Sequence, residues 1–188
     1  MIDLTDYLYK KIEPIIESWD EEGIYALSFF VHTNEGSENI PTFAISYNTE
    51  EDCEYSSPLS EQRWNYAFWR QDENEIIGDE ESTTILLQWY KENGIKDIGY
   101  EDETLMYDDD YNYIGKGPNG YYELLQIVSN VAKRLHDNKV ISNTFKREIP
   151  IGIHDLEYSW FSEKLTKNGN PNGIADIFLE ALRKGFPE

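Results

Sequence analysis

One segment restricts the fold more than any other: residues 24–32, IYALSFFVH, carry apolar side chains on both alternating faces. A strand that is apolar on both faces must be covered on both, so this segment predicts a central, buried strand. Residues 40–48 (IPTFAISYN) predict a second strand, with Pro41 near its start, where a missing backbone donor matters least. Polar residues at 34–37 predict a turn between the two, and therefore a β-hairpin.

Apolar residues at helical spacing predict several amphipathic helices. The segments with this pattern are residues 3–20, 80–93, 120–137, 159–165 and 174–184. Pro14 is expected to kink the first helix or split it in two, because proline removes a backbone donor. Gly94 and Gly185 follow two of the segments, as residues that commonly end helices do.

The remaining segments have weaker patterns. Residues 49–62 predict a surface loop, and residues 148–153 a short strand. In RWNYAFWRQ (63–71) the aromatic residues alternate, which favours a strand, although Trp64 and Phe68 are also helical neighbours. Residues 95–118 are rich in Asp, Tyr and Gly and predict short strands around a turn at 108–110.

Together these elements predict one α+β domain over residues 1–188, with a mainly antiparallel sheet packed by several amphipathic helices. A chain of 188 residues is long enough to bury one core but short for two domains. Its single cysteine excludes an internal disulfide, and its first residues do not have the pattern of a signal peptide. We therefore expect a cytoplasmic protein. The longest apolar runs are too short to span a membrane.

The charge is large and unevenly distributed. The net charge is −21, and residues 1–110 hold 28 acids against 6 bases, while residues 111–188 hold 9 acids against 10 bases. Such an acidic chain repels nucleic-acid phosphates and anionic lipids and attracts basic proteins. With 5 Trp, 14 Tyr and 8 Phe the chain is too aromatic for a disordered acidic tail. The expected partner is therefore a basic protein, and neither nucleic acid nor a membrane.

The three histidines give a weak indication of chemistry. His32 and His136 lie at the ends of predicted elements, where a structural or surface role is usual. His154 follows a predicted strand and precedes Asp155 and Glu157, a combination that could bind a metal or hold a general base. A hydrogen-bonded histidine at a strand end explains the same pattern, because no second His or Cys lies nearby in the sequence.

Other motifs do not identify an enzyme or a cofactor. Cys53 lies among carboxylates that disfavour its thiolate, and residues 115–120 are Gly-rich but match no phosphate-binding loop. Residues 108–112 resemble the start of a calcium loop, but Tyr113 stands where glycine is required and Asn119 where glutamate is required. We therefore expect no cofactor and no metal, and no catalytic residue is assigned.

An interaction surface remains, because acids alternate with aromatic residues over 100–113. Tyrosine buries a large area at little entropic cost, while acids attract a basic partner and pair with its Arg and Lys. The predicted binding residues are Glu101, Asp102, Glu103, Asp108, Asp109, Asp110, Tyr111 and Tyr113. Whether the aromatic residues at 64–69 join this surface or belong to the core is left open by the sequence.

Three segments, ISYNTEED (45–52), SEQRWNYAFW (60–69) and IPIGIHDLEY (149–158), resemble an uncharacterised family of small bacterial domains. Some relatives in that family are presumed immunity proteins encoded beside polymorphic toxins. The resemblance implies a cytoplasmic bacterial protein that neutralises a basic toxin, but it carries over no catalytic residue. The alternatives are an enzyme or metal-binding protein centred on His154, and an acidic regulatory or scaffold protein.

Overall fold

The segment that is apolar on both faces forms β1 (Ile24–Thr33), and its first eight residues are all buried. The computed structural model describes residues 1–33, 40–156 and 158–186. β1 pairs antiparallel with β2 (Pro41–Thr49) on one side and parallel with β4 (Ile151–His154) on the other. β3 (Asn74–Ile77) pairs antiparallel with β2, so the strand order is β3-β2-β1-β4.

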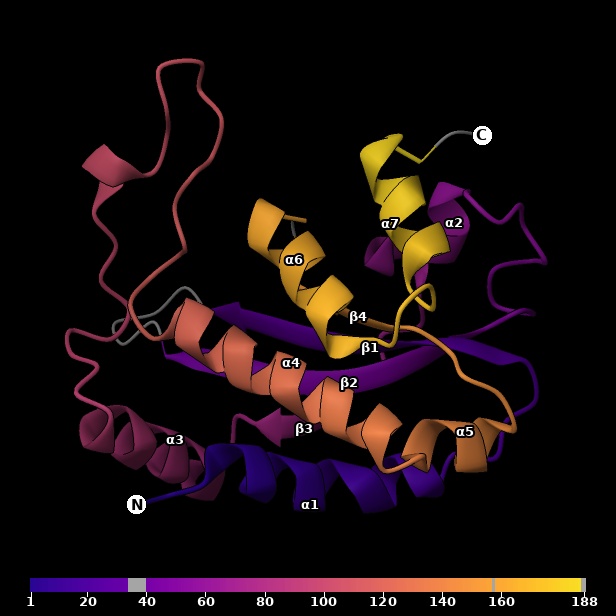
Figure 1. The fold of residues 1–188 in the computed structure, drawn as a ribbon, viewed down its shortest axis with the longest axis horizontal. Helices are drawn as coiled ribbons and strands as arrows, with labels where there is room; N and C mark the ends of the chain where they lie inside the picture. Colours follow the sequence, from indigo (N-terminus) through magenta and orange to yellow (C-terminus); the bar gives the residue numbers. More distant parts are fainter. Residues whose placement is uncertain (34–39, 157, 187–188) are drawn as a thin grey trace.

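This architecture confirms the predicted α+β fold (Figure 1). The predicted turn at 34–37 lies outside the described residues. The helices predicted from periodicity are all present: α1 (Leu4–Glu17), α3 (Glu80–Glu92), α4 (Tyr121–Asp137), α6 (Trp160–Gly169) and α7 (Asp176–Arg183). α1 continues through Pro14, so the proline does not split it. β3 and the short helix α5 (Val140–Phe145) had not been predicted.

The main core lies on one face of the sheet, to which Leu27, Phe29 and Val31 of β1 contribute. α1 and α4 pack there, and Figure 1 shows α4 crossing the sheet. The N-termini of α1 and α3 are capped by Asp3 and Asp79, whose carboxylates accept backbone N–H groups that have no partner within the helix. The strongest apolar stripes of the sequence thus form this core.

The opposite face of the sheet has a second, aromatic core. Trp64, Tyr66 and Trp69 are buried there against Phe30, together with Phe178 of α7. The strand predicted for 63–71 is wrong, because this segment forms the helical turn α2 (Glu61–Trp64) followed by a 3₁₀ turn, η1 (Tyr66–Phe68). The two turns direct three large rings at one sheet face, which an extended strand with alternating side chains would not do.

The free edge of β4 is closed by side chains that act as a fifth strand would. Asn170, which follows α6, accepts the backbone N–H of Ile151 at 2.8 Å and donates to its carbonyl at 2.8 Å. The hydroxyl of Thr166 accepts the N–H of Ile153 at 2.9 Å and donates to its carbonyl at 3.2 Å. Both side chains are buried, so the edge is satisfied without another strand.

Residues 100–118 form an arm that extends away from the sheet and the helices (Figure 1). The short strands predicted for 95–118 are wrong: the arm contains a 3₁₀ turn, η2 (Glu103–Leu105), and one isolated bridge between Tyr107 and Tyr113. Among the described residues, no neighbouring strand is present there to extend the ladder. Across the described residues, no helix combines the length and the apolar character that a membrane span requires.

Candidate functional site

The arm is held to the body at its root by backbone hydrogen bonds. The N–H of Gly99 donates to the carbonyl of Asn119 at 3.0 Å, and the N–H of Asn119 donates to the carbonyl of Tyr100 at 2.9 Å. Further along, the indole N–H of Trp160 donates to the carbonyl of Gly115 at 3.0 Å. The arm therefore projects from a fixed base and touches the start of α6 on its way.

The tip of the arm is a turn organised by Asp108. Its carboxylate accepts the side-chain amide of Asn112 at 3.0 Å and the backbone N–H groups of Asn112 at 2.8 Å and Asp110 at 2.9 Å, and these bonds, the side-chain one most, lower the pKa of Asp108. This is the way an aspartate side chain stabilises a tight turn. Tyr111, in the left-handed region at φ 62°, is 87% exposed beyond the turn.

The arm exposes several large apolar side chains to solvent. Leu105 is 68% exposed and Tyr100 62% exposed, and three others are at least half exposed: Tyr107, Tyr111 and Ile114. Exposed apolar side chains that gather in one place indicate an interaction surface, whereas single ones do not. The arm is the part of the described chain where they gather.

The arm is also strongly acidic. It contains six acids against one base, Lys116, whose amine lies 5.2 Å from the ring centre of Tyr122. Among the described residues, the ion pairs all lie outside the arm. By contrast, Arg63 and Arg70 of the body pair with acids of the body itself. The described carboxylates of the arm thus remain available to a positive partner.

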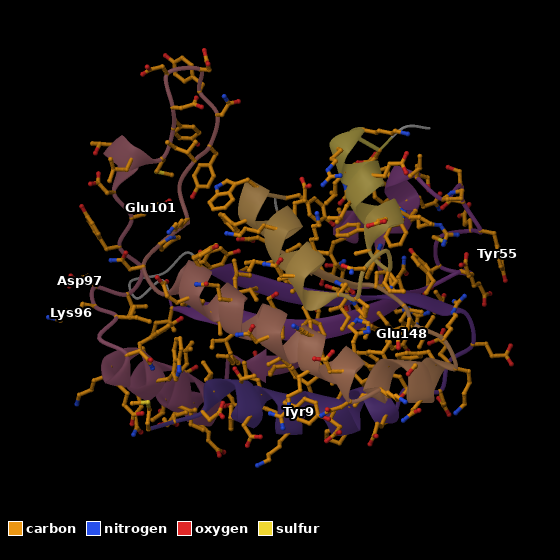
Figure 2. All side chains as sticks on the ribbon, viewed as in Figure 1. Tyr9, Tyr55, Lys96, Asp97, Glu101 and Glu148 are labelled. Carbon is orange, nitrogen blue, oxygen red and sulfur yellow. The ribbon has the colours of Figure 1, made fainter. Side chains whose placement is uncertain are left out.

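The structure divides the predicted binding residues into three groups. Asp108, Asp109, Asp110 and Tyr111 lie together at the exposed tip. Nearer the root, the hydroxyl of Tyr113 donates to Glu101 at 2.8 Å (Figure 2 labels Glu101).

The two other predicted residues lie beside η2. Asp102 accepts from the hydroxyl and the backbone N–H of Thr104, which lowers the pKa of Asp102. Glu103 begins η2, and its side chain lies outside the described part of the structure.

A groove separates the arm from the body. The arm contributes Glu101, Met106, Tyr107, Tyr111 and Tyr113, and the body contributes residues that include Tyr121, Asp155, Tyr158 and Phe161. The groove has a volume of about 540 Å³, and six of its 13 described lining residues are aromatic, with a carboxylate on each side. Binding sites for small groups are typically concave, largely apolar and provided with a few polar groups, as this groove is.

The second candidate site, His154, lies inside the aromatic core. Its Nε2 is 2.8 Å from the hydroxyl oxygen of Ser28, and its Nδ1 is 2.9 Å from the backbone carbonyl of Asp155. A carbonyl can only accept, so Nδ1 carries the proton and Nε2 accepts from Ser28. Burial lowers the pKa of His154 to about 4, despite the opposing effect of Asp155, so the imidazole is neutral at pH 7.

The surroundings of His154 do not match a metal site. Both of its ring nitrogens already have protein partners. The carboxylate of Asp155 accepts the hydroxyl of Tyr121 at 2.7 Å and the backbone N–H of Leu156 at 2.6 Å. Glu157 lies outside the described residues, and within the described ranges no three His, Cys, Asp or Glu side chains gather as metal ligands would.

The pair of Ser28 and His154 has the geometry of a nucleophile and its base, but it is closed to substrates. Ser28 has no solvent exposure and His154 is 2% exposed. The cavity beside His154 is lined by rings that include Tyr66 and Tyr158, and its volume is about 10 Å³. That is room for about one water molecule and for no acyl group.

We therefore expect Ser28 to remain unlabelled when the folded protein is treated with a fluorophosphonate probe for active serines. Mass spectrometry of the intact protein would measure this, with a known serine hydrolase labelled in parallel. Labelling that disappears both in Ser28→Ala and in His154→Gln would instead establish a hydrolase centre.

The other histidines and the cysteine considered from the sequence are held by contacts within the fold. His136 is buried, with Nδ1 at 2.6 Å from Glu148 and Nε2 at 3.2 Å from Asn170. His32 contacts the hydroxyl of Thr42 at 3.2 Å. Cys53 is fully buried.

The Gly-rich segment leads into α4. Its last residue, Gly120, adopts φ 91°, where an added Cβ would lie 3.0 Å from the ring of Tyr90. The segment is therefore a tight connection to the helix, packed against α3.

The aromatic residues at 64–69 belong mainly to the core, since only Phe68 is exposed. The predicted interaction surface consequently depends on the arm.

Two parts of these sites had not been predicted from sequence. Ser28 had a signal, because it is a polar residue within an apolar strand. The groove had none, because Glu101 and Asp155 are 54 positions apart in the sequence and face it only through the tertiary fold. Comparison with protein-family models, with curated proteins and with solved structures gave no match.

Proposed function

We propose that this chain is a protein-binding module whose arm, residues 100–118, binds the basic surface of another protein. The observation that carries this proposal is the coincidence of exposed apolar side chains with carboxylates that form no ion pair in the described structure. Exposed tyrosines supply contact area, and the acids speed encounter with a basic protein and pair with its Arg and Lys. The chain's net charge of −21 acts in the same direction and disfavours nucleic acid.

The resemblance to bacterial immunity-type domains narrows this proposal to the neutralisation of a basic toxin in the cytoplasm. The decisive experiment expresses the product of the adjacent gene alone and together with this chain. We expect that product to be toxic alone, harmless in the presence of this chain, and bound to it in a pull-down. A basic but harmless partner would favour a regulatory or scaffold role, and the absence of any basic partner would end the proposal.

Charge reversal at the tip of the arm tests which surface binds. In Asp109→Lys/Asp110→Lys the association rate should fall about tenfold at low salt, because the steering field reverses where the partner first meets the arm. Both residues are exposed, so stability should change by no more than about 0.5 kcal/mol per substitution. Biosensor kinetics at two ionic strengths measure the rate, and urea unfolding measures the stability.

The matched control is Glu17→Lys/Asp20→Lys, which changes the net charge equally at exposed positions at and just beyond the end of α1. This control should slow association much less than the tip variant. Equal effects of the two variants would show that overall charge, and not the arm, guides the encounter.

A further inference from the structure

We infer that the groove between the arm and the body is a binding site for the guanidinium group of an arginine side chain. This inference deepens the proposed function and rests on it, because the arginine would belong to the basic partner. The groove lies between the arm, which contributes Glu101, and the body, which contributes Asp155 directly after β4.

The two carboxylates keep capacity for a cation. One oxygen of Glu101 accepts the hydroxyl of Tyr113, and the other has no partner among the described residues. The oxygens of Asp155 each accept one hydrogen bond, whereas a carboxylate has about four acceptor positions. The described residues that line the groove include no Lys or Arg. A cation entering the groove would therefore meet a carboxylate from each side and no positive group among the described lining residues.

The walls favour guanidinium over ammonium. Tyr107 and Tyr113 on the arm face the same groove as Tyr121 and Tyr158 on the body. A guanidinium is planar, stacks on aromatic faces and pairs with carboxylates through two parallel bonds, whereas an ammonium is compact and strongly hydrated. A groove with rings on both walls and a carboxylate on each side matches the planar ion.

Tyrosine hydroxyls hold both carboxylates in place. Burial, reinforced by the hydrogen bond to Glu101, raises the pKa of Tyr113 to about 12. Burial also raises the pKa of Tyr121, which donates to Asp155. Both hydroxyls therefore stay protonated at neutral pH and keep donating, so the carboxylates are oriented before a ligand arrives.

The test titrates the full chain with N-acetyl-arginine methylamide and follows the tyrosine and backbone signals by NMR. We expect saturable binding on the order of 1 mM, as for a small ligand held by two charged contacts. The citrulline analogue has the same shape without the charge, and it should bind at least about tenfold more weakly. The lysine analogue should also bind more weakly than the arginine probe.

Glu101→Gln keeps the acceptor for the Tyr113 hydroxyl but removes the charge. This variant should bind the arginine probe about tenfold more weakly. The matched control is Asp97→Asn, an exposed carboxylate beside the root of the arm that does not line the groove (Figure 2). This control should leave binding unchanged. Thermal unfolding of both variants establishes that the fold is intact.

The inference is overturned by absence of binding, by equal binding of the citrulline or lysine probe, or by equal effects of Glu101→Gln and Asp97→Asn. These results are separate from the fate of the proposed function. If a partner binds in a salt-sensitive manner but the arginine probe does not bind, the arm remains the proposed binding surface and only the inference about the groove is lost. A probe that binds while no basic partner exists would keep the groove and remove the proposed function.

Discussion

Acidification from pH 6.5 to about pH 4 should lower the free energy of unfolding by about 3 kcal/mol through His154 alone. In the folded chain burial lowers the pKa of His154 from 6.5 to about 4. The unfolded chain therefore takes up a proton in this pH window while the folded chain does not, and stability falls with pH. Above pH 6.5 the imidazole is neutral in both states, so this contribution is then constant.

The surroundings of His154 explain why protonation is costly. Ser28, on β1, donates to one ring nitrogen, and the rings of Phe30, Tyr66 and Tyr158 pack around the imidazole. Asp155 provides the nearby negative charge, and its effect is smaller than that of burial. An imidazolium there would lose its hydration and force the Ser28 hydroxyl to turn away.

The measurement is urea unfolding from pH 7.5 down to pH 4 for the native chain and for His154→Gln. The variant is expected to be less stable at every pH because its packing changes, but to lose about 3 kcal/mol less than the native chain on acidification. Carboxylates elsewhere contribute equally to both proteins and cancel in the comparison. If the free energies of unfolding of the two proteins fell in parallel with pH, His154 would be protonated in the folded chain over this range, which would contradict the pKa lowered by burial.

Replacing Asn170 by alanine should lower the free energy of unfolding by about 2 to 5 kcal/mol. The substitution leaves both the N–H and the carbonyl of Ile151 without partners on the outer edge of β4. It also removes the contact of the amide with His136. Each buried backbone group that loses its partner costs about 1–3 kcal/mol.

Asn93→Ala is the matched control for this prediction. Asn93 is exposed at the end of α3, and within the described structure its side chain donates only to the carbonyl of Trp89 in the same helix. Its loss should cost at most about 0.5 kcal/mol. If urea unfolding gives similar values for the two variants, water must reach the edge of β4 and replace the amide.

Local patterns in the sequence were enough to predict most elements of the fold. The two-faced apolar run of β1 and the helical stripes of α1 and α4 each reflect contacts with a continuous core, so their periodicity is strong. The strand predicted for residues 63–71 was wrong because aromatic rings two and four positions apart fit both a strand and a helix. Only the packing of these rings on the second face of the sheet decides between the two. The parallel pairing of β4 with β1 joins residues more than 100 positions apart, which no local pattern encodes.

The same distinction between local patterns and long-range contacts applies to the candidate sites. The exposure of Asp109, Asp110 and Tyr111 follows from a polar, turn-forming stretch and could be predicted. The bond between Ser28 and His154 and the groove between Glu101 and Asp155 depend on how distant segments meet. The sequence of His154 and Asp155 suggested a shared site, yet the fold places the imidazole in the core and the carboxylate beside the groove.

The paired backbone bonds at the root of the arm, between Gly99, Tyr100 and Asn119, have a consequence for evolution. Because the root closes on itself, the residues beyond it can change in number and kind while the strands and helices keep their places. Under the proposed function, selection for folding then acts on one set of residues and selection for recognition on another. A gene encoding such a chain would acquire a new target by altering fewer than 20 codons, with little risk of losing the fold that presents them.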